Sequence, residues 1–425
     1  ATVLLTAPRP EAFATFLTVR NSRNIAVRNL TLDWDPLPFT QGRLSERNGA
    51  TLTFELMDGF SAPETMGVSR IQEYDPETRQ IAPDTHHIRR IKLPPEPGPS
   101  LEPAGPGRVR VTLPDALAEE AAKLALGKHF LLTYRIYGHQ AYFFENCSNV
   151  ALENCTIYTT AGMACLARHV ENIRCEDVRV MRKPGTSRFL SLSADALHFT
   201  HCKGTITVRN CHLDGQGDDG INVHGTYLFP TRKVDERTVE VGLRFPYIEP
   251  AAGDEMELMD PDGRNLWTAH VEEIAREKQR LLHITFNRPL PPGDATEKLL
   301  TLSGWMPSIE IADSTFTANR GRGVLLQTRN ALLRNCRFED ISGPAVVVYF
   351  DPRNIHKEAI TARNVEIRGN RIVRCPRFRN LAGIAVYAHV HKPETRQHTD
   401  YAPAGSTRKS RSDNNQTPNP ATPGN

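Results

Sequence analysis

Three aspartates carry the chemistry that this sequence suggests. Asp195 precedes Asp218 by 23 residues and Asp219 by 24. If that separation is one turn of a repeating structure, stacking brings the three carboxylates together. Repulsion between like charges makes such a cluster costly, so its presence suggests a functional site. Hydrolysis of a glycosidic bond uses such a group, because one carboxylic acid protonates the leaving oxygen while another carboxylate activates water or attacks the sugar. Three carboxylates favour direct attack by water, with inversion.

The Asp218-Asp219-Gly220 segment has two other interpretations. It also fits an ordinary Asx turn, and acidic clusters can bind calcium through their oxygen atoms. Adjacent residues of a flat strand point to opposite faces, so both aspartates reach one site only at a bulge or turn. Gly215, Gly217 and Gly220 favour such a bulge.

Further polar residues could contact a bound sugar. Asn222 and His224 follow the aspartate pair on alternating strand positions, although a lone histidine on a strand is more often structural. Arg320 and Arg322, in the sequence NRGRG, could orient a carboxylate or contact a hydroxyl; a solvated turn is an equal alternative. Trp305 could stack on a sugar face or fill the core.

The elements that position these residues are copies of one sequence repeat. Each copy has alternating β-branched residues, a polar turn and a second short strand. Seven copies lie at residues 24–32, 149–157, 172–180, 204–213, 308–316, 330–338 and 364–372. Their closing apolar residues are separated by 22 or 23 residues, or by 33 or 34 where a loop is added. A unit of about 22 residues is typical of one rung of a right-handed parallel β-helix, an all-β solenoid.

Two steps between closing residues are much longer, 125 residues from Leu32 to Ile157 and 103 from Leu213 to Phe316. They predict small β-barrel modules at 43–138 and 228–303, inserted in a catalytic β-helix formed by 1–42, 139–227 and 304–390. We expect module strands at 51–56, 108–113, 129–134, 238–241, 255–259 and 281–286. A helix is expected over 115–127. Residues 391–425 lack apolar periodicity and are predicted to be disordered.

The composition argues against several functional classes. Fifty-two Lys and Arg against 49 Asp and Glu give a net charge of +3, too balanced for a nucleic-acid-binding surface. No run of about 18 apolar residues is present, so no membrane span is predicted. The eight cysteines form no CxxC pairs, which argues against zinc and favours free, buried thiols over disulfides.

Four segments resemble glycoside hydrolase family 110: GQGDDGINVHGTYL at 215–228, DWDPLPFTQG at 33–42, WMPSIEI at 305–311 and NRGRG at 319–323. That family contains inverting, exo-acting α-1,3-galactosidases, including those that remove the blood group B galactose, and its β-helix is interrupted by β-barrel modules. The resemblance implies a galactose-terminated glycan as substrate, of blood group B type or a linear α-1,3-digalactoside. It implies no metal and no organic cofactor. It also implies a periplasmic or secreted protein.

Carried over by position, Asp195, Asp218 and Asp219 match the three active-site acids of the family. The resemblance implies Asp218 as general acid, with Asp195 and Asp219 positioning the water, in a cluster that titrates as a unit. The sequence departs from the family at residues 355–359, where IHKEA replaces an expected Trp-x-Glu-Ser-Gly turn and keeps only Glu358 as a candidate substrate contact. The chain is also expected to begin inside the family's β-helix.

Two other functions stay open as alternatives. A polygalacturonase-like enzyme of glycoside hydrolase family 28 also resembles the pattern of one Asp followed by Asp-Asp a rung later. It would require an Asn-Thr-Asp context, a Gly-His-Gly one rung beyond the pair and a basic Arg-Ile-Lys, which this sequence lacks. A non-catalytic β-helix adhesin or carbohydrate-binding protein would use the acids to hold sugar or calcium. The inserted modules offer surfaces for a homodimer.

Overall fold

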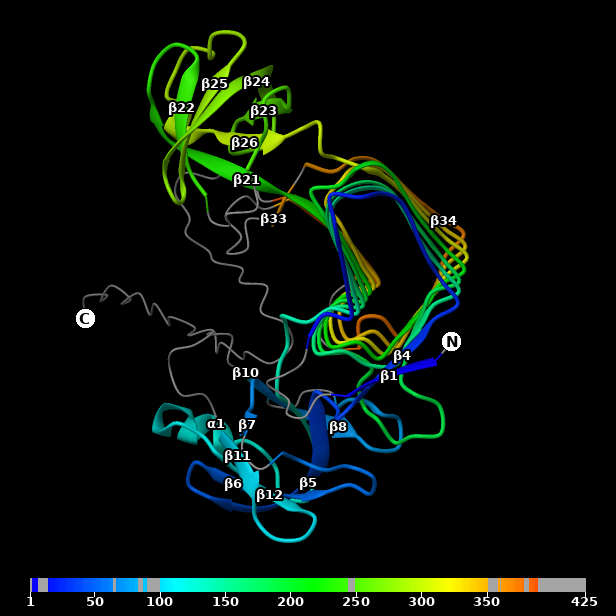
Figure 1. Cartoon of the computed structure of the whole chain (residues 1–425). Coiled ribbons are helices and arrows are strands. Elements are labelled where there is room, and N and C mark those ends of the chain that lie inside the picture. Colours follow the sequence, from blue (N-terminus) through cyan, green and yellow to red (C-terminus); the bar gives the residue numbers. More distant parts are fainter. Residues whose placement is uncertain are drawn as a thin grey trace, which may run out of the picture.

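The regular secondary structure of the described residues is almost entirely β. The computed structural model describes residues 2–6, 14–63, 66–82, 87–89, 100–243, 249–350, 358–359, 361–377 and 382–388 (Figure 1). The tail predicted to be disordered, 391–425, lies outside these residues. None of the described helices is long and apolar enough to cross a membrane.

Coils of parallel strands, one above another, form the largest body, which we call the parallel stack (Figure 1). One ladder joins β14 (Tyr142–Glu153), β16 (Cys165–Glu176), β18 (Leu197–Thr200), β21 (Ile221–Lys233), β29 (Val324–Leu326), β32 (Val346–Phe350) and β36 (Ile384–Ala388). A second joins β1 (Thr2–Thr6), β4 (Thr31–Asp35), β15 (Thr156–Ile157), β17 (Arg179–Val180), β20 (His212–Asp214), β28 (Thr315–Thr317), β31 (Arg337–Glu339) and β35 (Arg371–Val373).

The third ladder completes each coil. It includes β3 (Arg23–Arg28), the second halves of β14 and β16, β19 (Lys203–Arg209), β27 (Ser308–Ala312), β30 (Arg329–Arg334) and β34 (Arg363–Arg368), while β2 (Leu17–Arg20) pairs with the start of β14. Parallel pairing between successive coils is consistent with the predicted β-helix.

The strand register confirms the spacing predicted from the closing residues. Leu32 pairs with Ile157, and Leu213 pairs with Phe316, so each of the two long sequence steps is a single step in the stack. Phe316 in turn pairs with Phe338, and their rings stack with centroids 4.6 Å apart. The apolar positions of the repeat therefore form rows that run along the interior.

The cysteines belong to these interior rows. All eight are free thiols, and all except the half-buried Cys375 are buried, in agreement with the prediction. Cys155 and Cys175 pack in the same apolar core as Leu152 and Val208. Here cysteine acts as a small hydrophobe.

A row of asparagines holds one corner of the coils. Asn24, Asn149 and Asn172 have φ values of 57°, 56° and 61°, in the left-handed region that asparagine adopts more readily than most residues. The Asn149 Nδ2 donates to Asn24 Oδ1 at 2.9 Å, and the Asn172 Nδ2 donates to Asn149 Oδ1 at 3.1 Å. The polar turn residue of the repeat thus joins three successive coils.

Asn149→Ala is expected to lower the free energy of unfolding by about 1–2 kcal/mol, because it removes two amide hydrogen bonds and places alanine in the left-handed region. Asn149→Gly is the matched control, since glycine adopts that conformation without strain. Urea unfolding of both variants gives the comparison. Equal losses would show that backbone strain contributes nothing at this corner.

The first inserted module is an antiparallel sheet. Its strands are β5 (Phe39–Asn48), β6 (Thr51–Leu56), β7 (Met66–Gly67), β8 (Arg70–Asp75), β9 (Gln80–Ile81), β10 (His87–Arg89), β11 (Ser100–Pro103), β12 (Arg108–Thr112) and β13 (His129–Thr133). The pairing order is β10-β8-β13-β5-β6-β12-β11-β7, with β9 beside β8. This path does not close on itself within the described residues, so the barrel form of this module stays a prediction.

The helix predicted over 115–127 is wrong in length. A 3₁₀ turn covers Asp115–Leu117, and the α-helix α1 covers only Ala118–Ala122. The Arg47 guanidinium, from β5, donates to the carbonyls of Ala122 and Leu124 at 2.7 and 2.6 Å. These carbonyls therefore have a partner other than a further helical turn, a long-range contact that the local sequence does not contain.

The second module is a closed barrel, as predicted. The ring runs from β21 through β22 (Thr238–Gly242), β25 (Leu281–Phe286), β24 (Asn265–Lys278), β23 (Glu255–Met259) and β26 (Leu299–Leu302) back to β21. A 3₁₀ turn, Ala295–Glu297, precedes β26. The strand β21 belongs to both bodies, since Ile221–Val223 pair within the stack and Phe229–Lys233 within the barrel. Between them, Gly225 and Thr226 pair with β33 (Glu358–Ala359).

Candidate active site

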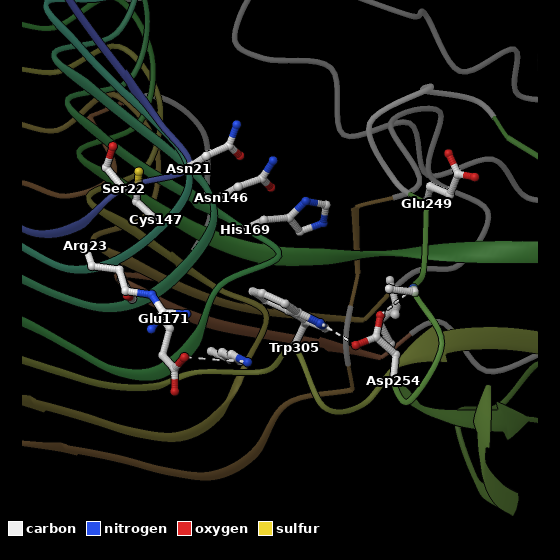
Figure 2. A pocket seen from close by; sticks show the side chains of 14 residues that line it. Asn21, Ser22, Arg23, Asn146, Cys147, His169, Glu171, Glu249, Asp254 and Trp305 are labelled. Carbon is white, nitrogen blue, oxygen red and sulfur yellow. Dashed lines mark hydrogen bonds and ion pairs between the residues drawn. The ribbon is translucent and has the colours of Figure 1, made fainter. Parts of the chain in front are cut away.

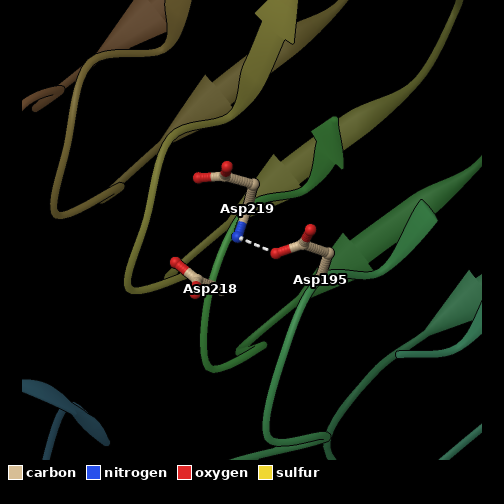
Figure 3. A group of neighbouring side chains, drawn as sticks. All are labelled: Asp195, Asp218 and Asp219. Atoms are coloured by element: carbon tan, nitrogen blue, oxygen red, sulfur yellow. Dashed lines mark hydrogen bonds between the residues drawn. The ribbon is translucent and has the colours of Figure 1, made fainter. Parts of the chain in front are cut away.

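The three aspartates lie together at one edge of the parallel stack. Asp195 precedes β18, and Asp218 and Asp219 lie in the turn before β21, one coil further on (Figure 3). The Asp219 backbone N–H donates to Asp195 Oδ1 at 3.0 Å. Oxygen atoms of the three carboxylates lie within 4.8 Å of one another. The structure therefore brings together the residues that one-rung spacing predicts to be neighbours.

Glycines make the close approach of these turns possible. A Cβ on Gly217 would lie 2.4 Å from the Ser193 carbonyl oxygen, and a Cβ on Gly220 would lie 2.5 Å from that of Gly323. On Gly321, in the next coil, it would lie 2.3 Å from Asp219 Oδ1. Successive turns thus touch through backbone, which is how two adjacent aspartates come to face one site.

Asp195 is buried, with 4% of its surface exposed. Burial raises its pKa well above the usual range, and the nearby Asp218 carboxylate raises it further. Its Oδ2 lies 2.7 Å from Nδ1 of His198, which is on β18. Asp195 is therefore a group that binds a proton strongly beside a partner that can share it.

Asp219 is buried and held by Arg322. The backbone N–H of Arg322 donates to Asp219 Oδ1 at 2.7 Å, its Nε donates to the same atom at 2.8 Å, and its Nη2 contacts Oδ2. Burial raises the pKa of Asp219 to about 7, while the guanidinium acts to lower it. Without the Arg322 guanidinium, the pKa of Asp219 would be raised further by burial.

Asp218 is the most accessible of the three acids. The Tyr137 hydroxyl donates to its Oδ2 at 2.7 Å, and Arg320 Nη2 lies 3.5 Å from its Oδ1. Arg320 is fixed by donation from Nε to the Gly217 carbonyl at 2.7 Å. Arg322 therefore holds a carboxylate by hydrogen bonds and Arg320 lies beside another, in line with the first of the three interpretations that the sequence allows.

A pair of histidines continues from Asp195. His198 Nε2 lies 3.0 Å from His224 Nε2, and His224 Nδ1 lies 2.6 Å from the Gly225 carbonyl oxygen. Glu358 Oε1 lies 4.0 Å from His224 Nε2. Burial is the largest cause that lowers the pKa of both histidines. His224 and Glu358 thus belong to the same site as the acids.

Two members of the site were missed by the sequence reasoning. His198 pairs in register with Asn222, so the one-rung offset that relates Asp195 to the aspartate pair also relates these residues. That offset could have identified His198. Tyr137 lies in the segment that returns from the first module, and no local pattern marks it.

The remaining predicted residues lie in two different places. Asn222 is buried at 3% exposure, and its Oδ1 has no hydrogen-bond partner in the part of the chain that the structure describes. Trp305 lines a separate cavity of about 520 Å³ between the stack and the barrel, with His169 and Lys203 beside it (Figure 2). Its Nε1 donates to Asp254 Oδ1 at 3.0 Å. Substrate contact by Trp305 stays a prediction.

The three carboxylates are also the group of described residues that could hold a metal ion. Their charge is already opposed by Arg322 on Asp219 and by Arg320 near Asp218. Two fixed guanidinium groups disfavour a further cation at this position. Without an ion, the arrangement supplies an accessible acid and two buried carboxyl groups around one point, which is what glycoside hydrolysis uses.

Comparison with known proteins finds several curated relatives of one kind. No protein-family profile matches the chain. Curated relatives include α-1,3-galactosidase A of Akkermansia muciniphila, 27% identical over 63% of this chain and 45% of the relative, and α-1,3-galactosidase A of Shewanella woodyi, 24% identical over 87% and 62%. An α-1,3-galactosidase B of Phocaeicola vulgatus is 33% identical over 54% of this chain and 41% of the relative.

The parallel stack and the carboxylate cluster are features that a β-structured glycoside hydrolase could use. The relatives support the assignment of the chain to glycoside hydrolase family 110, which its motifs resemble. The chain spans about half the length of the curated relatives that it matches.

Proposed function

We propose that this protein is an exo-acting glycosidase that hydrolyses terminal α-1,3-linked galactose. The observation that carries the proposal is the contact of Asp195 with the Asp218-Asp219 pair across one coil, in a chain whose curated relatives are named α-1,3-galactosidases. The substrate is a galactose-terminated glycan, of blood group B type or a linear α-1,3-digalactoside. No resident cofactor is required.

Asp218 is the general acid in this proposal, and Asp195 and Asp219 position the attacking water. The exposure of Asp218 supports the role, because its side chain is 16% exposed against 6% for Asp195 and 1% for Asp219. Asn222, His224, Arg320, Arg322 and Glu358 are the proposed residues around the sugar, together with the more distant Trp305. The free Oδ1 of Asn222 is suited to accept a hydrogen bond from a hydroxyl.

Inversion is the finer part of the proposal. Acid and base in inverting enzymes are usually about 6.5–9.5 Å apart, and in retaining enzymes about 5–5.5 Å. The closest oxygens here are within 4.8 Å, a spacing between nearest atoms rather than between carboxyl groups. Three acids in contact support inversion only if two of them share the water, so the anomer of the product is decisive.

The test is galactose release from an α-1,3-digalactoside, followed by proton NMR during the first minutes. β-Galactose as the first product supports water attack with inversion. α-Galactose would show that a carboxylate forms a covalent intermediate. Release of galacturonate from polygalacturonan, with no action on either galactoside, would support the polygalacturonase-like alternative instead. Binding of the glycan without turnover would support the adhesin alternative.

The same proposal extends to architecture and location. We infer that the parallel stack is a right-handed parallel β-helix of residues 1–42, 139–227 and 304–390, with the inserted modules bounded at 43–138 and 228–303; the registers between coils support it. A periplasmic or secreted location follows from the family resemblance, and the inserted modules offer surfaces for a homodimer. Light scattering of the purified protein tests the dimer.

Gly321→Ala is expected to lower the rate of galactose release at least about tenfold, because the new Cβ must displace the Asp219 carboxylate from Arg322. Gly304→Ala is the matched control, since its Cβ would meet nothing closer than 3.6 Å. Rates and melting temperatures of both variants are measured together. Full activity in Gly321→Ala would mean that the position of Asp219 is not critical.

A further inference from the structure

The two histidines link the buried Asp195 to a more exposed carboxylate. Side-chain exposure is 6% at Asp195, 10% at His198 and 8% at His224, and it rises to 22% at Glu358. The imidazole rings are perpendicular, with centroids 4.9 Å apart. They come from the adjacent strands β18 and β21, so their contact is fixed by the stack.

The hydrogen bonds in this chain restrict where its protons can be. The Gly225 carbonyl only accepts, so His224 carries hydrogen on Nδ1. A neutral His224 then accepts at Nε2, and the hydrogen of a neutral His198 must be on Nε2. Nδ1 of His198 is left as an acceptor, and the 2.7 Å contact requires the proton to be on Asp195.

Two transfers move this proton outward. Asp195 gives its proton to Nδ1 of His198, which becomes an imidazolium, and His198 gives the hydrogen on its Nε2 to Nε2 of His224. Asp195 is then a carboxylate, His198 is the other neutral tautomer, and His224 is an imidazolium whose Nε2 lies 4.0 Å from Glu358 Oε1. The Nε2 hydrogen of His224 then passes to the Glu358 carboxylate and from there to solvent, which leaves His224 neutral. His198 must regain its first tautomer, with hydrogen on Nε2, before the next turnover. Each step breaks one O–H or N–H bond and forms another, so no further reactant is required.

Inverting hydrolysis requires a route of this kind. The base ends each turnover with a proton taken from water, and the acid ends it without one. Asp195 has little contact with solvent, so it must return its proton through neighbouring groups. On the basis of the proposed function, we propose that His198, His224 and Glu358 form the path through which Asp195 exchanges its proton with solvent. In this path the two histidines act through Asp195 as positioning residues, and His224 does so in addition to its proposed place beside the sugar.

The charged groups around the path are compatible with transient protonation of the two histidines. Asp218, Asp219, Glu358 and Arg322 face Asp195, and the first three also favour the protonated form of His198. At His224, Glu358 favours protonation, whereas burial and His198 oppose it. The proton can therefore pass through the imidazoles without resting there at neutral pH.

Buried His201 and half-buried His169 lie beyond the pair. His201 has a pKa held well below the usual range by burial, with smaller contributions from His169 and His224. Its Nδ1 is 2.9 Å from Thr200 Oγ1. These groups add positive charge near His224 only at low pH, so the outward direction is towards Glu358.

The first experiment does not depend on activity. Protein labelled with ¹⁵N-histidine is compared with His198→Asn and His224→Gln to assign the two imidazoles by NMR. We expect neutral His224 with hydrogen on Nδ1 and neutral His198 with hydrogen on Nε2 at pH 7. Two rings with the same tautomer, or a permanently charged His198, would overturn the proposal.

The second experiment separates proton return from chemistry. His224→Gln is expected to lower steady-state turnover at least about tenfold more than it lowers single-turnover galactose release. Added imidazole should restore turnover, and His270→Gln, an exposed barrel histidine, should behave as wild type. Equal loss of both rates without rescue would show a structural role. Inactivity of the wild type would refute the proposed function, while the NMR result would still decide the proton path.

Discussion

Asp218→Asn is expected to reduce galactose release by at least about 10³-fold, because an amide cannot protonate the leaving oxygen. The substitution keeps the shape of the side chain, and Asn Oδ1 can still accept from the Tyr137 hydroxyl. Folding should therefore be unchanged. The rates are measured on the α-1,3-digalactoside, with the melting temperature of each protein.

Asp313→Asn is the matched control for this prediction. Asp313 lies on the same stack, with a 52% exposed side chain and a φ of 54° that asparagine tolerates. It should keep full activity. Calorimetric titration with the digalactoside adds a second reading: Asp218→Asn should bind with near-normal affinity, and retention of wild-type turnover would place the general acid elsewhere.

The stack was predictable because its information is local and periodic. Each coil ends at an apolar residue that must face the interior. The number of residues from Ile157 to Val180 therefore already predicts that these two residues pair. An offset one residue longer places Asp195 beside Asp219. Long insertions leave this register unchanged, since Leu213 and Phe316 still pair across 103 residues.

Contacts between the modules and the stack were not predictable in this way. Tyr137 reaches Asp218 from a segment 81 residues earlier, and Arg47 ends α1 from a strand 75 residues before it. Neither contact follows a period, because each depends on how two separate bodies pack. Trp305 shows the same limit, since the sequence left sugar contact and core packing both open, and the packing of the barrel decides that Trp305 lines a separate cavity.

Arg322→Gln is expected to move the acidic limb of the pH–rate profile upward and to lower the rate at pH 6 at least about 100-fold. The Arg322 guanidinium favours the ionised form of Asp219, so its loss raises a pKa that burial has already brought to about 7. Asp219 must be ionised to position water. Activity therefore falls as the pH drops through that pKa, and the variant should lose activity at a higher pH than the wild type.

Recovery at alkaline pH separates this electrostatic effect from damage to the turn. If Arg322 acts by charge, the variant should regain much of its rate between about pH 8 and 9, where Asp219 ionises again. Arg334→Gln is the control, because Arg334 pairs with Glu310 on the third ladder, away from the acids. A rate that is low at every pH would mean that Arg322 holds the geometry of the turn, and that the ionisation of Asp219 does not limit the reaction.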